Sequence, residues 1–220
     1  MPNVDLILGA DPSRRRSVRT EPSQRRSTQR LDALLDAAAD IVDETGFERL
    51  TTQMVAERAG ASIGTVYRYF PDRVAVLHAL RERSIRRFRE RVADELERTK
   101  LSTWWDVVDI ALDSATALYR DEPGFTVVHA APRETTDGTT EPVFANRMAQ
   151  VIESEFDVEA DATELRFRLG VAIELADALI NRAFERDAEG DARYLEEAKR
   201  LAHHYVAEHL GEARAATTAA

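Results

Sequence analysis

The chain has 220 residues, of which 44% are hydrophobic and 32% charged, a balance typical of folded globular proteins. It has no cysteine, which excludes disulfides, thiol nucleophiles and cysteine-ligated metal sites, and it has no apolar run long enough to span a membrane. Glycine and proline are few and separate long segments without breakers, so we expect an all-α protein. No signal-like apolar stretch precedes the first arginines, and we expect a cytoplasmic location.

The net charge of −10 is distributed unevenly along the chain. Residues 13–30 contain seven arginines and one glutamate, whereas residues 31–73 contain four arginines and eight acids. Residues 101–220 contain eleven basic and twenty-four acidic residues. The asymmetry indicates that the N-terminal end meets an anion that the rest avoids. We expect residues 1–27 to be a flexible basic arm, which either lies along a polyanion or is only a solvated leader.

Apolar periodicity, capping residues and helix breakers predict nine helices. In chain order they span 31–45, 52–59, 63–70, 73 to about 99, 104–120, a short stretch between Pro123 and Pro132, 142 to about 156, about 161–187 and about 191–210. The expected N-caps are Thr51 or Thr52, Ser62 and Asp72. We expect residues 133–141 to be a polar loop and residues 211–220 a disordered tail.

The most informative stretch is 51–73, TTQMVAERAGASIGTVYRYFPDR. Two short helices joined by a tight turn at Gly60 predict a helix-turn-helix, packed through Val55, Ala56, Ala59 and Val66. The second helix has a polar outer face from which Ser62, Thr65, Tyr67 and Tyr69 can bond to phosphates or base edges, while Gly64 permits a close approach. The spacing alone also fits a helical hairpin with core tyrosines.

The motifs from about Gln29 to Leu77 resemble, in order, the DNA-binding domain of TetR-family transcriptional regulators. The matching residues are Gly46-Phe47, Thr51-Thr52, Val55-Ala56, Ala59-Gly60-Ala61-Ser62, Gly64-Thr65-Val66-Tyr67-Arg68-Tyr69-Phe70 and Arg73, where the family most often has lysine. The resemblance implies a DNA-binding domain over 28–74. It places Thr52, Gln53 and Ser62 at the DNA edge and Ile63, Gly64 and Thr65 deepest in the major groove. It places Tyr67 and Tyr69 at phosphates or flanking bases, Arg73 at a phosphate, and Phe47 and Phe70 in the core.

The resemblance also implies that residues 75–210 form a helical ligand-binding and dimerisation domain. The last two helices carry long apolar stripes and are expected to form half of a four-helix bundle with a second subunit. The interface residues we expect are Leu179, Ala183, Tyr194, Ala198, Leu201 and Tyr205. The alternative is that both helices only cover their own core.

A small-molecule effector of unknown identity is expected in this second domain. The pocket residues we expect are Trp105, Val108, Leu112, Asp113, Phe125, His129, Phe144 and Met148. A carboxylate beside aromatic rings favours a lipophilic cation, but the acidic surplus of the surface leaves the ligand charge open. We expect no cofactor and no metal site, because the histidines at 203, 204 and 209 are poorly placed as ligands.

The sequence therefore predicts a dimeric, one-component transcriptional regulator. In this hypothesis it is a repressor that binds a palindromic, double-stranded operator and is released by its effector. Two alternatives stay open: a ligand-independent helix-turn-helix DNA-binding protein, and a helical enzyme or interaction module. Without a nucleophile, a phosphate loop or a metal cluster in the sequence, we do not expect an enzyme.

Overall fold

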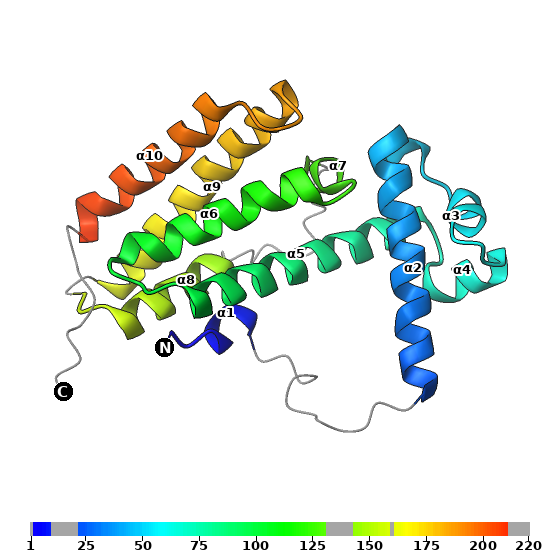
Figure 1. Ribbon diagram of the computed structural model, residues 1–220, viewed down its shortest axis with the longest axis horizontal. Helices are drawn as coiled ribbons and strands as arrows, with labels where there is room; N and C mark the ends of the chain where they lie inside the picture. Colours follow the sequence, from blue (N-terminus) through cyan, green and yellow to red (C-terminus); the bar gives the residue numbers. More distant parts are fainter. Residues whose placement is uncertain (1, 10–21, 131–142, 159–160, 211–220) are drawn as a thin grey trace. The chain divides into compact units, whose positions relative to one another are not determined.

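The computed structural model describes residues 2–9, 22–130, 143–158 and 161–210, with the backbone alone at 22–25 and 129–130. These residues are nearly all helical and include no β-strand, which confirms the all-α class. In order the elements are α1 (Asp5–Leu8), α2 (Pro22–Thr45), the 3-10 turn η1 (Phe47–Arg49), α3 (Thr52–Arg58), α4 (Ile63–Tyr69), α5 (Arg73–Arg98), α6 (Trp104–Asp121), α7 (Phe125–Ala130), α8 (Val143–Glu155), α9 (Ala162–Arg186) and α10 (Ala192–Leu210) (Figure 1). None of these helices is long and apolar enough to cross a membrane.

The chain divides into two compact units. The described residues within Asp11–Arg87 and Asp121–Arg133 form the small unit, and those within Met1–Ala10, Phe88–Arg120 and Glu134–Ala220 form the large unit. The predicted domain boundary at 74–75 differs from this division, which falls after Arg87. Helix α5 is continuous across the change of unit, so no break in the sequence marks it.

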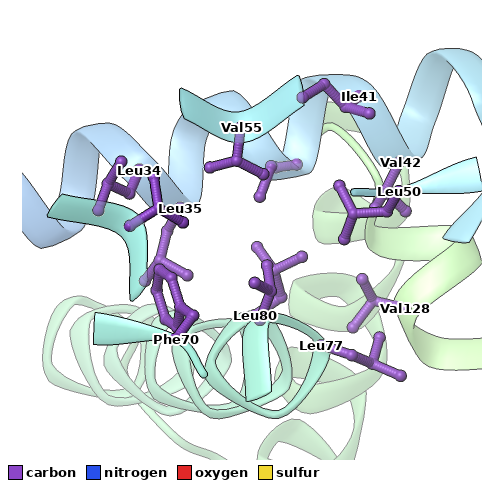
Figure 2. Close-up of a cluster of buried hydrophobic side chains, with 14 of the residues drawn as sticks. Leu34, Leu35, Ile41, Val42, Leu50, Val55, Phe70, Leu77, Leu80 and Val128 are labelled. Atoms are coloured by element: carbon purple, nitrogen blue, oxygen red, sulfur yellow. The ribbon is translucent and has the colours of Figure 1, made fainter. Parts of the chain in front are cut away.

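The core of the small unit is built from one face of α2 and the elements that cover it (Figure 2). Leu34, Leu35, Ile41 and Val42 on α2 recur with helical spacing and are buried. They pack with buried residues from the rest of the unit, namely Leu50, Val55, Val66, Phe70, Val76, Leu77, Leu80 and Val128. Because Val76, Leu77 and Leu80 of α5 belong to this core, the first half of α5 is part of the small unit.

The turn before α7 fits closely against α2. Gly124 has a φ of +71°, and a Cβ there would come within 2.8 Å of the Ala39 carbonyl oxygen. Its N–H donates to Asp43 Oδ1 at 2.9 Å, and Arg81 Nε donates to the Val128 carbonyl at 3.2 Å. Residues 121–130 therefore belong to the small unit although they follow α6 in the chain.

The predicted arm of residues 1–27 needs correction at both ends. Helix α2 begins at Pro22 and not near Leu31. The sequence did not reveal this first part of the helix, because residues 22–30 are polar and residues 26–30 are exposed, so they form no apolar stripe. At the other end α1 packs against α8, and Ile7 is 0% exposed. A four-residue helix is too short for a periodic pattern to reveal it. Residues 10–21 lie outside the described residues.

The large unit contains α6, α8, α9, α10, α1 and the second half of α5. Helices α9 and α10 pack side by side and are joined by a turn at Gly190, which has a φ of +85°. Asp161 caps α9 by accepting from the N–H groups of Thr163 and Glu164 at 3.0 and 2.9 Å. The helix boundaries predicted here from 161 to 210 agree with the structure, whereas the predicted loop 133–141 and tail 211–220 lie outside the described residues.

Candidate nucleic-acid interface

The turn between α3 and α4 is closed by backbone hydrogen bonds. Thr51 caps α3, its side-chain oxygen accepting from Met54 N at 3.1 Å. At the other end Gly60 adopts a φ of +57°, and Ala61 N donates to the Ala56 carbonyl at 2.9 Å. This is the Schellman motif, in which a glycine in the left-handed conformation ends a helix. The predicted helix-turn-helix is confirmed in its caps and its turn.

Helix α4 begins at once after the turn. The Ser62 side chain caps it by accepting from Thr65 N at 3.1 Å, and its Oγ lies 2.8 Å from Thr65 Oγ1. Val66 faces the core and is fully buried, whereas Ile63 and Tyr67 are 38% and 55% exposed. The cap therefore starts a helix that is anchored on one side and presents the predicted residues on the other.

Two tyrosines of α4 join it to its neighbours. Tyr67 Oη accepts from Thr52 Oγ1 at 3.4 Å, which brings two predicted DNA-contact residues from different helices together. Tyr69 Oη lies 3.0 Å from the hydroxyl of Ser27 on α2. Sequence reasoning missed Ser27, which it assigned to the arm. The arginine-rich composition of residues 25–30 is the only sequence signal that pointed to this part of the surface.

Gly64 lies on α4 where the described residues leave room for a side chain. Its backbone is helical, and apart from its own helix backbone and chain neighbours no described atom lies within 4 Å of where a Cβ would sit. Gly60 differs, because its positive φ gives glycine a conformational reason to be there. Neither packing nor backbone geometry within the described residues accounts for glycine at position 64.

The remaining predicted contact residues are exposed. Arg73, at the start of α5, donates from Nη1 to the Glu48 carbonyl at 3.0 Å, and its guanidinium carbon lies 5.7 Å from the centre of the Phe47 ring. Gln53 Nε2 donates to Glu57 Oε1 at 2.8 Å along α3. Phe47 is half-buried against the core, as expected.

Several acidic side chains of the small unit accept hydrogen bonds from other groups of the chain. Two nitrogens of Arg58 bond both Glu44 oxygens at 2.9 and 2.7 Å, and these hydrogen bonds hold the pKa of Glu44 below its ordinary value. Asp36 accepts from the buried Arg83 at 2.7 Å, and Asp72 caps α5 through Ala75 N. The acidic balance of residues 31–73 is therefore partly offset inside the small unit.

The predicted pocket residues fall into different environments. Val108, Leu112 and Met148 are buried in the large unit, where Trp105 and Phe144 are half-buried. Phe125 is buried in the small unit, and the side chain of His129 lies outside the described ones. A single pocket lined by all eight residues stays a prediction.

Asp113 does not have the role expected of a polar anchor. Its side chain is exposed and lies 2.7 Å from Lys199 Nζ, which also contacts Asp109 at 2.8 Å. Burial lowers the pKa of Lys199, but the hydrogen bonds that its ammonium group donates to Asp109 and Asp113, with the charges of both carboxylates, outweigh burial and raise that pKa. The ion pair joins α6 to α10, so the Asp113 carboxylate already has a cationic partner within the chain.

The predicted dimer residues also divide into two groups. Leu179, Tyr194, Leu201 and Tyr205 are partly exposed on α9 and α10. Ala183 and Ala198 are buried within the chain itself, so they offer little surface to a second subunit. Phe167 and Leu175 on α9, which the sequence analysis did not choose, are 60% and 44% exposed.

Comparison with known proteins agrees with this geometry. Residues 34–80 match the family described as bacterial regulatory proteins, tetR family, and residues 102–210 match a domain described as tetracyclin repressor-like, C-terminal. The fold and the exposed face of α4 define a helix-turn-helix regulator. A TetR-family transcriptional regulator from Streptomyces coelicolor is 32% identical, with a TM-score of 0.68 over 83% of this chain and 98% of that one. The chain belongs to the TetR family, as the sequence motifs predicted.

Other relatives share less. The HTH-type transcriptional repressor KstR of Mycolicibacterium smegmatis is 43% identical over 49 residues, which are 22% of this chain and 24% of KstR. This chain thus spans only about a quarter of that curated relative. FadR of Bacillus subtilis, solved in complex with stearoyl-CoA, is 17% identical with a TM-score of 0.58 over 80% of this chain and 97% of that one. At that identity the likeness concerns the fold alone.

Proposed function

We propose that this TetR-family protein is a dimeric repressor that inserts α4 into the major groove of a palindromic operator. The observation that carries the proposal is the open position of Gly64. A helical glycine without a packing role costs a domain about 0.5–1 kcal/mol relative to alanine. Because glycine has no side chain, it lets the helix approach the base edges closely, and this function explains why glycine is present. Ser62, Thr65 and Tyr67 beside it supply hydroxyl groups that bond to bases and phosphates.

The basic start of α2 supports the same placement. The contact between Ser27 and Tyr69 brings this end of α2 next to α4. Residues 25–30 carry three arginines, and guanidinium groups beside a reading helix favour binding to the DNA backbone. Phosphate contacts of this kind position the helix and leave sequence recognition to α4.

Assembly as a dimer is supported by the exposed face of α9. Large apolar side chains at Phe167 and Leu175 are costly to leave in water, and burying them against a second copy removes that cost. A two-fold dimer presents two copies of α4, and their half-sites lie about 34 Å apart, or one turn of duplex. The operator is then an imperfect palindrome.

Release by a small molecule requires a physical link between ligand and DNA. Helix α5 supplies a covalent one, because the same helix contributes Leu77 and Leu80 to the core of the small unit and continues into the large unit. A ligand that favours one position of α5 in the large unit shifts the population of DNA-competent dimers. No catalytic step is part of this proposal.

Selection from random-sequence duplexes tests the proposal. We expect enrichment of one imperfect palindrome, bound by a dimer at physiological salt, and release of that duplex by a compound that binds the large unit. A ligand-independent DNA-binding protein would select a palindrome that no compound in a broad screen releases. An enzyme or interaction module would enrich no sequence, and that result would contradict the proposal.

A further inference from the structure

Two arginines of the large unit form an unusual pair where α5 meets α8. Arg89 lies on α5, and its Nε–H is buried without an acceptor among the described residues. Burial, followed by the positive charge of Arg147 on α8, lowers the pKa of Arg89. Two like charges that approach each other in a partly buried place repel and destabilise the unit.

The surroundings of the pair offer little compensation. Arg147 Nη1 donates to the Ile7 carbonyl at 2.9 Å, and its guanidinium lies so close to Gly9 that a Cβ there would collide with it. No carboxylate of the described residues is paired with Arg89 or Arg147. Other cations of the same unit have such partners, in the pairs Arg120–Glu189, Arg166–Glu153, Arg168–Glu164, Arg182–Glu185 and Lys199–Asp113. Within the described part of this acidic unit, Arg89 and Arg147 are therefore two guanidinium groups without a carboxylate partner.

Aromatic residues stand close to both arginines along their helices. The rings of Phe88 and Phe144 pack with their centres 4.7 Å apart, next to Arg89 in the chain and one turn before Arg147. Met148 follows on the same side of α8 and is fully buried. The region thus combines two positive groups with an aromatic contact that an alkyl chain can extend.

We infer that Arg89 and Arg147 form an oxyanion site that binds the carboxylate or phosphate group of an amphiphilic effector, whose apolar part lies against Phe88 and Phe144. A guanidinium group presents its Nε–H and Nη–H donors as a fork that matches two oxygens of such an anion. The bound anion supplies the missing acceptor and screens the repulsion between the arginines. The inference rests on the proposed function for its effector, and it assigns a negative charge to a ligand whose charge the sequence left open.

The position of the site on α5 allows anion binding to affect the DNA-binding unit. Arg89 is the second α5 residue of the large unit, directly after the segment that ends at Arg87 in the small unit. An anion held at Arg89 and Arg147 fixes α5 against α8 at this point. It therefore favours one arrangement of α5, which is the helix that the two units share.

Calorimetric titration of the full-length protein with four ten-carbon amphiphiles tests the inference. The probes are decanoate, decyl phosphate, decanol and decyltrimethylammonium, all below their micelle concentrations. We expect one or both anions to bind, and Arg89→Gln and Arg147→Gln to weaken that binding about tenfold or more. Decanoate and decyl phosphate distinguish a carboxylate effector from a phosphate effector. Arg166→Gln, which removes a paired arginine elsewhere on the large unit, is the matched control and should bind like the wild type.

Thermal unfolding without ligand distinguishes a binding role from a structural one. Arg89→Gln should melt at or above the wild-type temperature, because the substitution removes a repulsive charge and breaks no bond to a described acceptor. A lower melting temperature than that of Arg166→Gln would contradict the inference. So would anion binding that survives Arg89→Gln, or decanol binding as tightly as decanoate.

DNA binding separates this inference from the proposed function. Operator release by decanol or decyltrimethylammonium, without anion binding, overturns the oxyanion site and leaves the repressor proposal standing. Anion binding that depends on Arg89, in a protein that prefers no DNA sequence, supports the site and overturns the repressor proposal.

Discussion

Replacing Gly64 with alanine should separate stability from DNA binding. The new Cβ meets no described atom of the chain beyond its own helix, and the backbone is already helical, so the fold has no reason to resist it. Alanine in a helix is favoured over glycine by about 0.5–1 kcal/mol. Because position 64 lies in the first turn of α4, we expect the gain in unfolding free energy to be at the lower end of that range.

DNA binding should respond in the opposite direction. A methyl group at position 64 holds the helix away from the base edges and disrupts neighbouring contacts. One base contact is worth about 1–3 kcal/mol, so affinity for the selected duplex should fall roughly tenfold or more. Fluorescence anisotropy with a labelled duplex measures this change, and urea unfolding measures the stability of the same sample.

Gly60→Ala is the matched control for this experiment. Nothing lies near a Cβ there either, but its φ of +57° makes alanine unfavourable by about 1–2 kcal/mol. The two substitutions add the same methyl group and should change stability with opposite sign. If Gly64→Ala binds the duplex as tightly as the wild type, or loses as much stability as Gly60→Ala, our account of α4 is wrong.

Three further predictions follow from other parts of the chain. Gly124→Ala combines a positive φ with a Cβ that collides with a backbone carbonyl of α2, so urea unfolding should show a loss of about 2–4 kcal/mol; a neutral result would contradict the close packing of that turn. Phe167→Glu should convert the proposed dimer to monomers in light scattering, whereas Val143→Glu, at an exposed apolar position on α8, should leave it intact. The Arg193 guanidinium holds the pKa of Asp191 well below its ordinary value, so the stabilising charge acts above about pH 4 and is lost as pH falls through the folded-state pKa. The melting temperatures of wild type and Asp191→Asn should therefore converge as pH is lowered from 7 towards 2, and a pH-independent gap would count against this ion pair.

The helix-turn-helix could be predicted because its signals are local. Thr51, Ser62 and Asp72 each accept a hydrogen bond from an N–H three residues later, so capping chemistry is visible within four letters of sequence. Gly60 marks its turn by a conformation that other residues rarely adopt. Burial of Val66 and Phe70 follows from the same helical period.

Other features depend on contacts between distant segments and leave no local pattern. The apolar stripes on α9 and α10 indicate that both helices are buried, but they do not tell which residues face each other within one chain. Ala183 and Ala198 lie on those stripes, and their burial within one chain shows only in the folded structure. The pairing of Asp113 with Lys199 likewise joins residues far apart in the chain.

The most direct test of the central claim compares affinity for the selected duplex with affinity for a scrambled duplex of equal length. We expect the wild type to prefer the selected duplex by about 10³-fold or more at physiological salt. Thr65→Ala and Tyr67→Ala should each weaken binding to that duplex about tenfold or more, with melting temperature and dimer unchanged. Equal wild-type affinity for both duplexes, or normal binding by both variants, would contradict the assignment of α4 as the helix that reads DNA.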